Sequence, residues 1–331
     1  MKSTKRLSII WFVLIVLGYG IIFALRQSML MSDMVIDSLS MIGINIILAV
    51  SLNLIIGFSG QFSLGHAGFM AVGAYTTAIF TMHYPTTYLG FLLSIVLGAM
   101  ITALLALLVG LPTLRLKGDY LAIATLGIAE IIRIVIVNGQ DDPSEHFFAT
   151  GGAAGIFGVV NYANWEVIYI LMVLSILIIS HFIHSDLGRM MLAVREDEIA
   201  AESIGIQPTS IKVLAFVIGA TIASVAGSLH ASYVQTIVPN DFGFMKSIDI
   251  LIIVVFGGIG SLTGSIVAGV LLGILNHFLR NVSGVSDYRM IIYSLALILM
   301  MLYKPSGLMG EKEFSLKRLL KRNMNKKEAS L

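Results

Sequence analysis

The chain has 331 residues, of which 57% are hydrophobic and only 12% are charged, and its formal net charge is +2. A soluble domain carries roughly 25% charged residues, so this composition excludes an ordinary soluble protein and predicts an integral membrane protein. The sequence contains no cysteine, which excludes disulfides, thiolate metal sites and thiol catalysis.

Apolar runs that are long enough to cross a bilayer, which takes roughly 20 residues, recur along the whole chain. No soluble domain with a core of its own fits between them, so the sequence predicts one all-α, polytopic domain. Crossings are predicted at residues 7–25, 35–56, 66–82, 88–111, 120–138, 166–184 and 212–233, followed by a glycine-interrupted region at 248–279 and a last helix at 288–303.

The first run follows Lys2, Lys5 and Arg6, as the core of a signal peptide would. It exceeds the usual length of such a core, about 7 to 15 residues, and no small-x-small cleavage site follows it. We therefore expect a retained first helix, and we assign residues 1–34 to an N-terminal cytoplasmic segment and this helix.

Lysine and arginine favour the cytoplasmic side of a membrane. The N-terminal cations and the basic tail at 306–331 therefore predict that both termini are cytoplasmic, which requires an even number of crossings. Arg115, Arg189 and Arg195 then fall in cytoplasmic loops, whereas the acidic segment "QDDPSEHFF" is external. Seven crossings leave the chain outside at Val234, so we predict about ten in total, with eight as the alternative, and a transmembrane domain at 35–305.

The stretch "GFSGQFSLGHAGFMAVGAY" at 57–75 places flexible, polar backbone between two apolar runs of 16 residues. Each run gives about 24 Å of helix at ~1.5 Å per residue against a hydrocarbon core of ~30 Å, so part of the stretch is expected at membrane depth. Non-helical backbone is tolerated there only when it is buried in protein or lines a wet cavity.

A weaker echo of this pattern, "GGIGSLTG", occurs at 257–264. Corresponding glycine breaks in two halves of a membrane protein point to a translocation pathway. Candidate pathway residues are Gly57, Gly60, Gln61, Ser63, His66, Gly257, Gly258 and Gly260. The alternative is that the glycines serve helix packing alone, together with a face of small residues formed by Ala67, Ala71, Ala74 and Ala78, and that His66 is a structural residue.

Two charged residues, Glu130 and Arg133, lie within a predicted crossing at a spacing that allows them to pair on one helix face. Ionisable groups in a bilayer are expensive and usually face protein or water. The pair is expected either to line the pathway or contact a partner permease, or to be a neutralised structural pair.

The chain lacks a P-loop and even a Gly-Lys dipeptide, and its seven histidines form no short-range metal-ligand pattern. We therefore expect no catalysis, cofactor, metal site or nucleic-acid partner, and any ATP must be hydrolysed by another chain. The cytoplasmic loop at 185–211 contains "EDEIAAES", which favours a short helix ended by Gly205, with Pro208 soon after. A soluble motor could bind such a helix; the alternative is a solvated connection.

Three segments together, "GFSGQFSLGHAGFMAVGAY", "LRLKGDYLAIATLGIAEIIRI" and "GRMMLAVREDEIAAESIGI", resemble the branched-chain amino acid ABC transporter permeases of the LivM type, over roughly residues 35–305. The resemblance implies an importer subunit of about ten helices in the bacterial inner membrane. It also implies a second, LivH-type permease, two ABC ATP-binding subunits and an extracytoplasmic solute-binding protein. Its ATPase-docking residues would be Arg195, Glu196, Asp197, Glu198, Ala200, Ala201 and Gly205.

One departure from the common docking pattern limits this comparison. Ile199 precedes the two alanines where an acid is usual, Glu198 is displaced by one position, and the downstream "AFVI" lacks a proline. The docking geometry of other importers is therefore not carried over.

Three other functions remain open on the sequence. A permease of the same superfamily could move urea, amides or other amino acids. An ion-coupled transporter would favour acidic residues at its broken helices, and both glycine breaks lack them. A passive channel for a neutral solute would not need the helix that the 185–211 loop is predicted to form.

Overall fold

The computed structural model describes residues 17–20, 22–24, 26–27, 32–84, 87–116, 118–139 and 149–281, and after these 291, 294–295, 298–299, 302–304, 306–310 and 313. The predicted first crossing at 7–25 and last helix at 288–303 lie largely outside the described residues, as does most of the basic tail.

Every crossing that the sequence predicts between residues 35 and 279 corresponds to a helix. The helices are α2 (Asp33–Asn53), α3 (His66–His83), α4 (Tyr88–Thr113), α5 (Asp119–Val137), α6 (Trp165–His184), α7 (Asp186–Glu196), α8 (Glu198–Ser203), α9 (Pro208–Val234), α10 (Phe244–Gly257) and α11 (Leu262–Asn281). A π-helical turn, η1 (Leu54–Phe58), extends α2, and two 3-10 turns, η2 (Gly152–Ala154) and η3 (Pro239–Phe242), lie in connections.

Within the described ranges, six helical segments are long and apolar enough to cross a membrane. They are Asp33–Phe58, Tyr88–Thr113, Asp119–Val137, Trp165–His184, Pro208–Val234 and Leu262–Leu279. The prediction of a helical, multi-pass membrane protein is therefore confirmed, whereas the total of about ten crossings stays a prediction.

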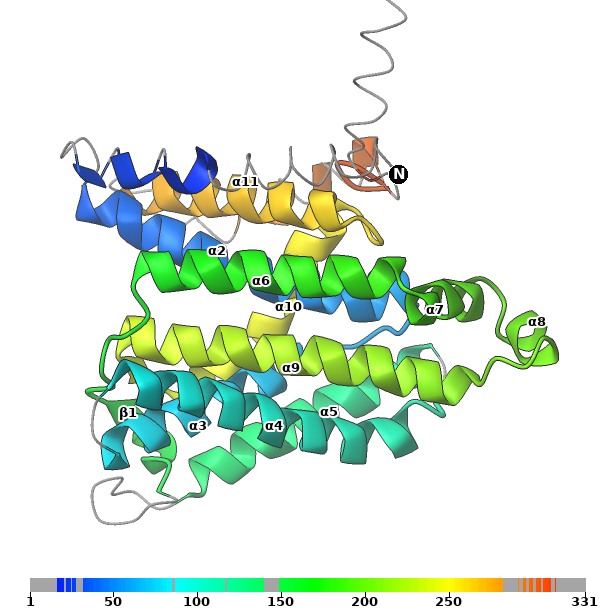
Figure 1. Cartoon of the computed structure of the whole chain (residues 1–331), viewed down its shortest axis with the longest axis horizontal. Coiled ribbons are helices and arrows are strands. Elements are labelled where there is room, and N and C mark those ends of the chain that lie inside the picture. Colours follow the sequence, from blue (N-terminus) through cyan, green and yellow to red (C-terminus); the bar gives the residue numbers. More distant parts are fainter. Residues whose placement is uncertain are drawn as a thin grey trace, which may run out of the picture.

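The helices form two layers joined through α2 and α10. Figure 1 shows α11, α2 and α6 in one layer and α9, α3, α4 and α5 in the other, with α10 crossing between them. Helix α2 packs against α6, α9, α10 and α11, and 83% of its most apolar stretch is buried. A run of isoleucine, leucine and valine side chains in α2 therefore forms the centre of the core rather than a lipid-facing surface.

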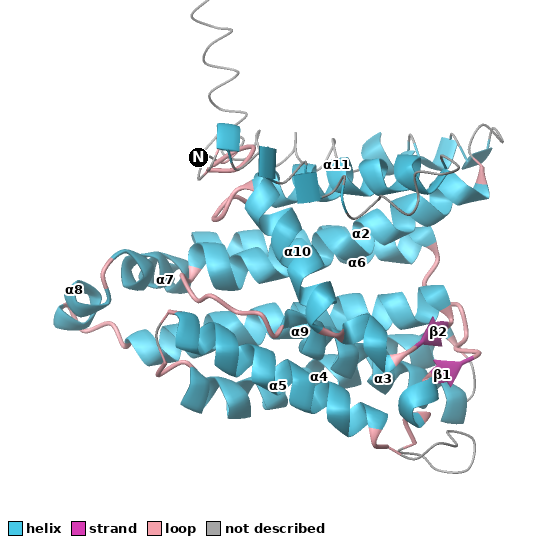
Figure 2. Cartoon of the chain, turned by 180° about the vertical axis from the view of Figure 1, so that it is seen from behind, coloured by secondary structure: helices cyan, strands magenta, loops and turns pink. Residues whose placement is uncertain are grey.

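The two ends of the bundle differ. At one end α7 and α8 project beyond the other helices, and we call this the α8 end (Figure 2). At the opposite end, β1 (Ile156–Phe157) pairs antiparallel with β2 (Thr236–Ile237), which ties the connection before α6 to the connection after α9. The sequence did not predict this short pair, in which Ile156 and Ile237 are both fully buried.

Small residues bring α3 and α9 close together. The four alanines of the predicted small face, Ala67, Ala71, Ala74 and Ala78, are all fully buried. On the same helix, a Cβ atom on Gly73 would lie 2.0 Å from the backbone oxygen of Ser224 in α9. Close backbone approach of this kind is how small residues stabilise helix pairs in membranes, so α3 carries the buried face of small residues that the packing alternative requires.

Candidate functional site

The two glycine breaks, far apart in sequence, lie against each other. The first break follows η1 and has no regular helix from 59 to 65, and the second separates α10 from α11 at 258–261. A Cβ atom on Gly57 would lie 2.3 Å from the backbone nitrogen of Gly260, so no larger residue fits at this contact. We call residues 57–60 and 257–261 the break junction.

The side chain of Asn53 holds the second break in place. It is fully buried in the last turn of α2. Its Oδ1 accepts a hydrogen bond of 2.8 Å from the backbone N–H of Gly260, and its Nδ2 donates to the Ser261 carbonyl at 2.9 Å and to Ser265 Oγ at 2.7 Å. Gly260 has a φ of +84°, which glycine adopts without strain. One amide therefore satisfies backbone groups that the interrupted helix leaves unpaired.

Residues 306–310 and Glu313 fold back onto the same break. The N–H groups of Leu308 and Met309 donate to the carbonyls of Phe256 and Gly257 at 2.9 and 3.1 Å. Glu313 Oε1 accepts from the Leu262 N–H at 2.7 Å, at the N-terminus of α11, where a negative charge is favourable. The start of the predicted basic tail thus caps the second break.

The 185–211 loop reaches the break junction through Arg195, in the last turn of α7. Its Nη1 donates a hydrogen bond of 2.7 Å to the carbonyl of Gly57. The same side chain packs on Gly60 and Gly260, where a Cβ atom would lie 3.1 Å from its Cγ and from its Nη1, respectively. One arginine therefore contacts both breaks.

The predicted short helix in this loop is confirmed as α8. Asp197 lies between α7 and α8, and its Oδ1 accepts from the N–H groups of Ile199 and Ala200 at 3.0 Å each, as an N-cap does. Gly205 follows α8 with a φ of +90°. Helix α7 was missed, because the sequence was interpreted as a loop with one short helix.

Helix α8 is largely polar, but one isoleucine in it and another directly after it are exposed. Ile199 and Ile204 are 80% and 74% exposed, whereas Ala201 is buried against the molecule. An ion pair of 2.9 Å between Glu198 and Lys212 fixes α8 to the start of α9. Exposed isoleucines on a held, polar helix are typical of a surface that contacts a partner protein.

Three predicted pathway residues are buried and bonded within the protein. Gln61 Nε2 donates to Ser59 Oγ at 2.6 Å and to the Lys212 carbonyl at 3.0 Å, next to the ion pair that holds α8. Ser63 Oγ accepts from the Gly65 N–H at 3.4 Å, and His66 Nε2 bonds to Ser51 Oγ at 2.8 Å. The structure thus brings Gly57, Gly60, Gly257, Gly258 and Gly260 to the junction, while Gln61, Ser63 and His66 bind neighbouring elements.

The predicted pair of Glu130 and Arg133 is formed. Arg133 Nε donates to the two carboxylate oxygens of Glu130 at 2.9 and 3.0 Å. Arg133 Nη1 also donates to Asn240 Oδ1 in η3, at 3.3 Å. The pair therefore ties α5 to the connection that leads into α10.

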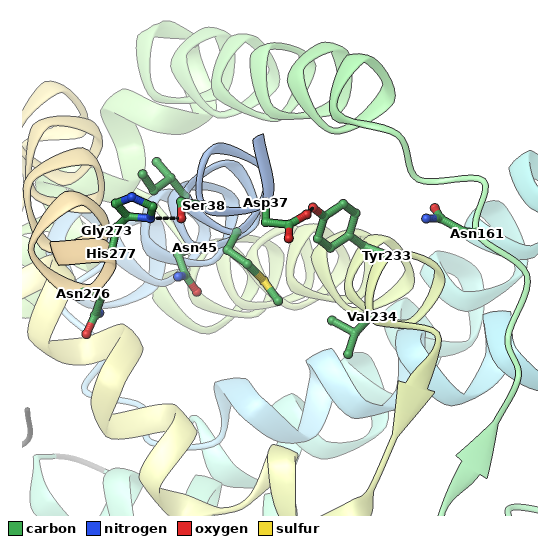
Figure 3. Close-up of a pocket in the computed structure, with 11 residues that line it drawn as sticks. Asp37, Ser38, Asn45, Asn161, Tyr233, Val234, Gly273, Asn276 and His277 are labelled. Atoms are coloured by element: carbon green, nitrogen blue, oxygen red, sulfur yellow. Dashed lines mark hydrogen bonds between the residues drawn. The ribbon is translucent and has the colours of Figure 1, made fainter. Parts of the chain in front are cut away.

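A cavity of about 420 Å³ opens at the end of the bundle opposite α8, between α2, α9 and α11 (Figure 3). Its lining residues are Asp37, Ser38, Met41, Ile42, Asn45, Asn161, Tyr233, Val234, Gly273, Asn276 and His277. The Tyr233 hydroxyl donates to Asp37 Oδ1 at 2.5 Å, and Ser38 Oγ bonds to His277 Nδ1. None of these residues was predicted from the sequence to form a site.

Comparison with known proteins identifies relatives over most of the chain. Residues 34–302 match the family described as the branched-chain amino acid transport system permease component. The chain is 35% identical to the high-affinity branched-chain amino acid transport system permease protein LivM of Salmonella typhimurium, over 87% of the chain and 73% of that protein. The identity to LivM of Escherichia coli is 34%, with the same coverage.

The second permease of such systems is also related. The permease protein LivH of Salmonella typhimurium is 26% identical to the chain, over 81% of the chain and 91% of LivH. No solved structure gives a significant match.

Proposed function

Because the chain belongs to the family of branched-chain amino acid transport permeases, we propose that it is the transmembrane subunit of an ATP-driven importer for leucine, isoleucine and valine. It forms the translocation pathway with a second, LivH-type permease. Two ABC ATP-binding subunits supply the energy and an extracytoplasmic solute-binding protein delivers the amino acid. The complex lies in the bacterial inner membrane, where this chain makes about ten crossings with both termini cytoplasmic.

The observation that carries this proposal is the connection between α8 and the break junction. Ile199 in α8 and Ile204 directly after it are exposed to a partner, and the adjoining α7 places Arg195 on both glycine breaks. A loop that only connected two helices would need neither feature. An ATPase bound at α8 could therefore move the backbone at the junction, as a permease that is driven by ATP requires.

The direct test is uptake of radiolabelled leucine by vesicles that contain this chain, the second permease, the ATP-binding subunits and the binding protein. We expect uptake that requires ATP and each partner. Uptake by this chain alone would contradict the proposal. Competition by urea, amides and other amino acids separates branched-chain amino acid transport from transport of another small solute by the same kind of permease.

The break junction and the residues that follow it up to His66 are the part of the pathway that we expect to change during transport. Because the chain has no cysteine, single cysteines at Gln61, Ser63 and His66 can report access of a polar thiol reagent. All three side chains are buried here, so labelling should rise in another state of the cycle. If the labelling rate is the same with and without ATP and with and without substrate, these residues serve packing alone.

We assign the pair of Glu130 and Arg133 to the surface that lines the pathway or contacts the second permease, since a charged pair in a crossing helix favours protein or water over lipid. Arg133→Ala leaves Glu130 without its partner. We expect weaker assembly of the two permeases or slower uptake. Unchanged assembly and unchanged uptake would show that the pair has no such role.

A further inference from the structure

The cavity at the end of the bundle opposite α8 has the character of a ligand site. Its volume of about 420 Å³ falls within the roughly 300–1,000 Å³ of small-molecule sites in proteins. It is distinct from the break junction, because it lies toward the start of α2 while the junction lies at the end of η1. The lining combines apolar side chains with an acid, an imidazole and several amides (Figure 3).

The polar groups of the cavity occur at two levels along α2. Asp37 and Ser38 lie near its first turn and Asn45 lies two turns further along, about 12 Å away at ~1.5 Å per residue. Met41 and Ile42 fill the interval. At the inner level, Lys246 Nζ donates to Asn45 Oδ1 at 3.4 Å. The outer polar level followed by Met41 and Ile42 matches a ligand with a polar head and a short apolar side chain, and Asn45 lies beyond them.

The negative charge of Asp37 at the outer level indicates which polar group of a ligand would bind there. Asp37 is exposed to the cavity mouth, and Tyr233 holds its carboxylate with a 2.5 Å hydrogen bond. A carboxylate fixed in this way is a partner for an ammonium group. The side chain of Asn276 from α11 lines the same space, and its amide can donate N–H groups to an anion, while His277 beside it is bonded through Nδ1 to Ser38 Oγ.

We infer that this cavity binds the free amino acid on its way through the permease, with the α-ammonium on Asp37, the α-carboxylate on the amide of Asn276, and the branched side chain on Met41 and Ile42. The inference rests on the proposed function, since it takes its ligand from the transported class. It adds a site within this chain that recognises the zwitterion, apart from any selection by the binding protein.

The test uses Val234, which lines the cavity from α9, as a reporter. In membranes that carry the full transporter, Val234→Cys is labelled with an impermeant maleimide in the presence of three probes. Leucine should slow the labelling. Leucinamide lacks the carboxylate and 4-methylpentanoate lacks the ammonium, so neither should protect at the same concentration. Asn138→Cys, exposed at the end of α5 and outside the cavity, is the control and should be labelled at one rate throughout.

A charge variant tests the role of Asp37 itself. In the Val234→Cys background, Asp37→Asn should raise the leucine concentration for half-protection about tenfold or more, because a charged hydrogen bond is lost. It should also abolish the preference for leucine over 4-methylpentanoate, and Asp37→Glu should restore it. Asp33→Asn removes the same charge one turn earlier, outside the cavity lining, and should change neither value.

The outcomes separate this site from the proposed function. ATP-driven leucine uptake without any protection of Val234→Cys would overturn the site and leave the importer intact. Protection by leucine in a transporter that does not import branched-chain amino acids would support the site and overturn the importer. Equal protection by leucine and 4-methylpentanoate in the unaltered Asp37 background would also overturn the assignment of the ammonium to Asp37.

Discussion

Removal of the Arg195 side chain should uncouple ATP hydrolysis from transport. Its guanidinium donates a 2.7 Å hydrogen bond to the Gly57 carbonyl, and the side chain is 23% exposed. A charged hydrogen bond contributes about 1.5–3 kcal/mol, and partial exposure places this one at the lower end, about 1.5–2 kcal/mol. That is a factor of roughly 10 to 30 in the equilibrium between connected and disconnected arrangements of the loop and the junction.

The assay measures ATP hydrolysed and leucine imported in the same reconstituted vesicles. For Arg195→Ala we expect the ratio of ATP to leucine to rise about tenfold, since the energy of the link is lost while α8 stays intact. The ATP-binding subunits should still co-purify with the variant, because Ile199 and Ile204 are unchanged. Arg195→Lys keeps one donor and should give an intermediate ratio.

Arg189→Ala is the matched control on the same helix. Its side chain is 69% exposed and pairs with Asp186 on the same helix, so its removal should leave the ratio unchanged. An Arg195→Ala transporter with the normal ratio of ATP to leucine would refute the mechanical role of Arg195. If the ATP-binding subunits no longer co-purified, the residue would instead serve assembly.

Three further changes test the packing and the partner surface. Asn53→Ala should lower the thermal unfolding midpoint of the purified protein, by the equivalent of about 2–3 kcal/mol, because three buried backbone or hydroxyl partners lose their hydrogen bonds; an unchanged midpoint would contradict its role as a clamp. Gly73→Ala should destabilise by about 1–3 kcal/mol, because its Cβ would lie 2.0 Å from the Ser224 oxygen. Gly127→Ala, which has open space around the added methyl group, is its control and should not destabilise. Ile199→Asp should leave the unfolding midpoint unchanged, because the side chain is 80% exposed, but should reduce co-purification of the ATP-binding subunits; equal recovery would remove Ile199 from the docking surface.

The helices were predictable because bilayer length and continuous apolarity define them. The ends of α4, α5 and α6 fall within two residues of the predictions. The short β pair was not predictable, since its two-residue strands carry no periodic pattern and Ile156 and Ile237 meet only after the bundle forms. Helix α7 was missed for a related reason, because a charged segment such as "DLGRMMLAVRE" lacks the apolar length by which the crossings were found.

The glycines at the break junction were predicted, whereas the residues that hold it were not. A glycine-rich stretch inside an apolar chain is visible in the sequence, but its partner depends on tertiary structure. The signal that could have found Asn53 is an amide inside the apolar run at 41–56, since a polar group in a buried membrane helix needs a partner. Asn45 carries the same signal, and it lies at the inner level of the cavity.

Both amides lie on α2, and this places the cavity and the junction on one helix. Asp37 and Asn45 line the cavity, Asn53 holds the second break, and Gly57 accepts the bond from Arg195. The π-helical turn η1 lies between Asn53 and the first break, and such turns are local departures from helical geometry that often occur at functional sites. A movement of α8 would be transmitted through the hydrogen bond from Arg195 to Gly57, and would therefore displace η1 before the buried part of α2. We therefore expect the conformational change to begin by rearrangement of η1, with the α2 segment that lines the cavity following as a rigid unit.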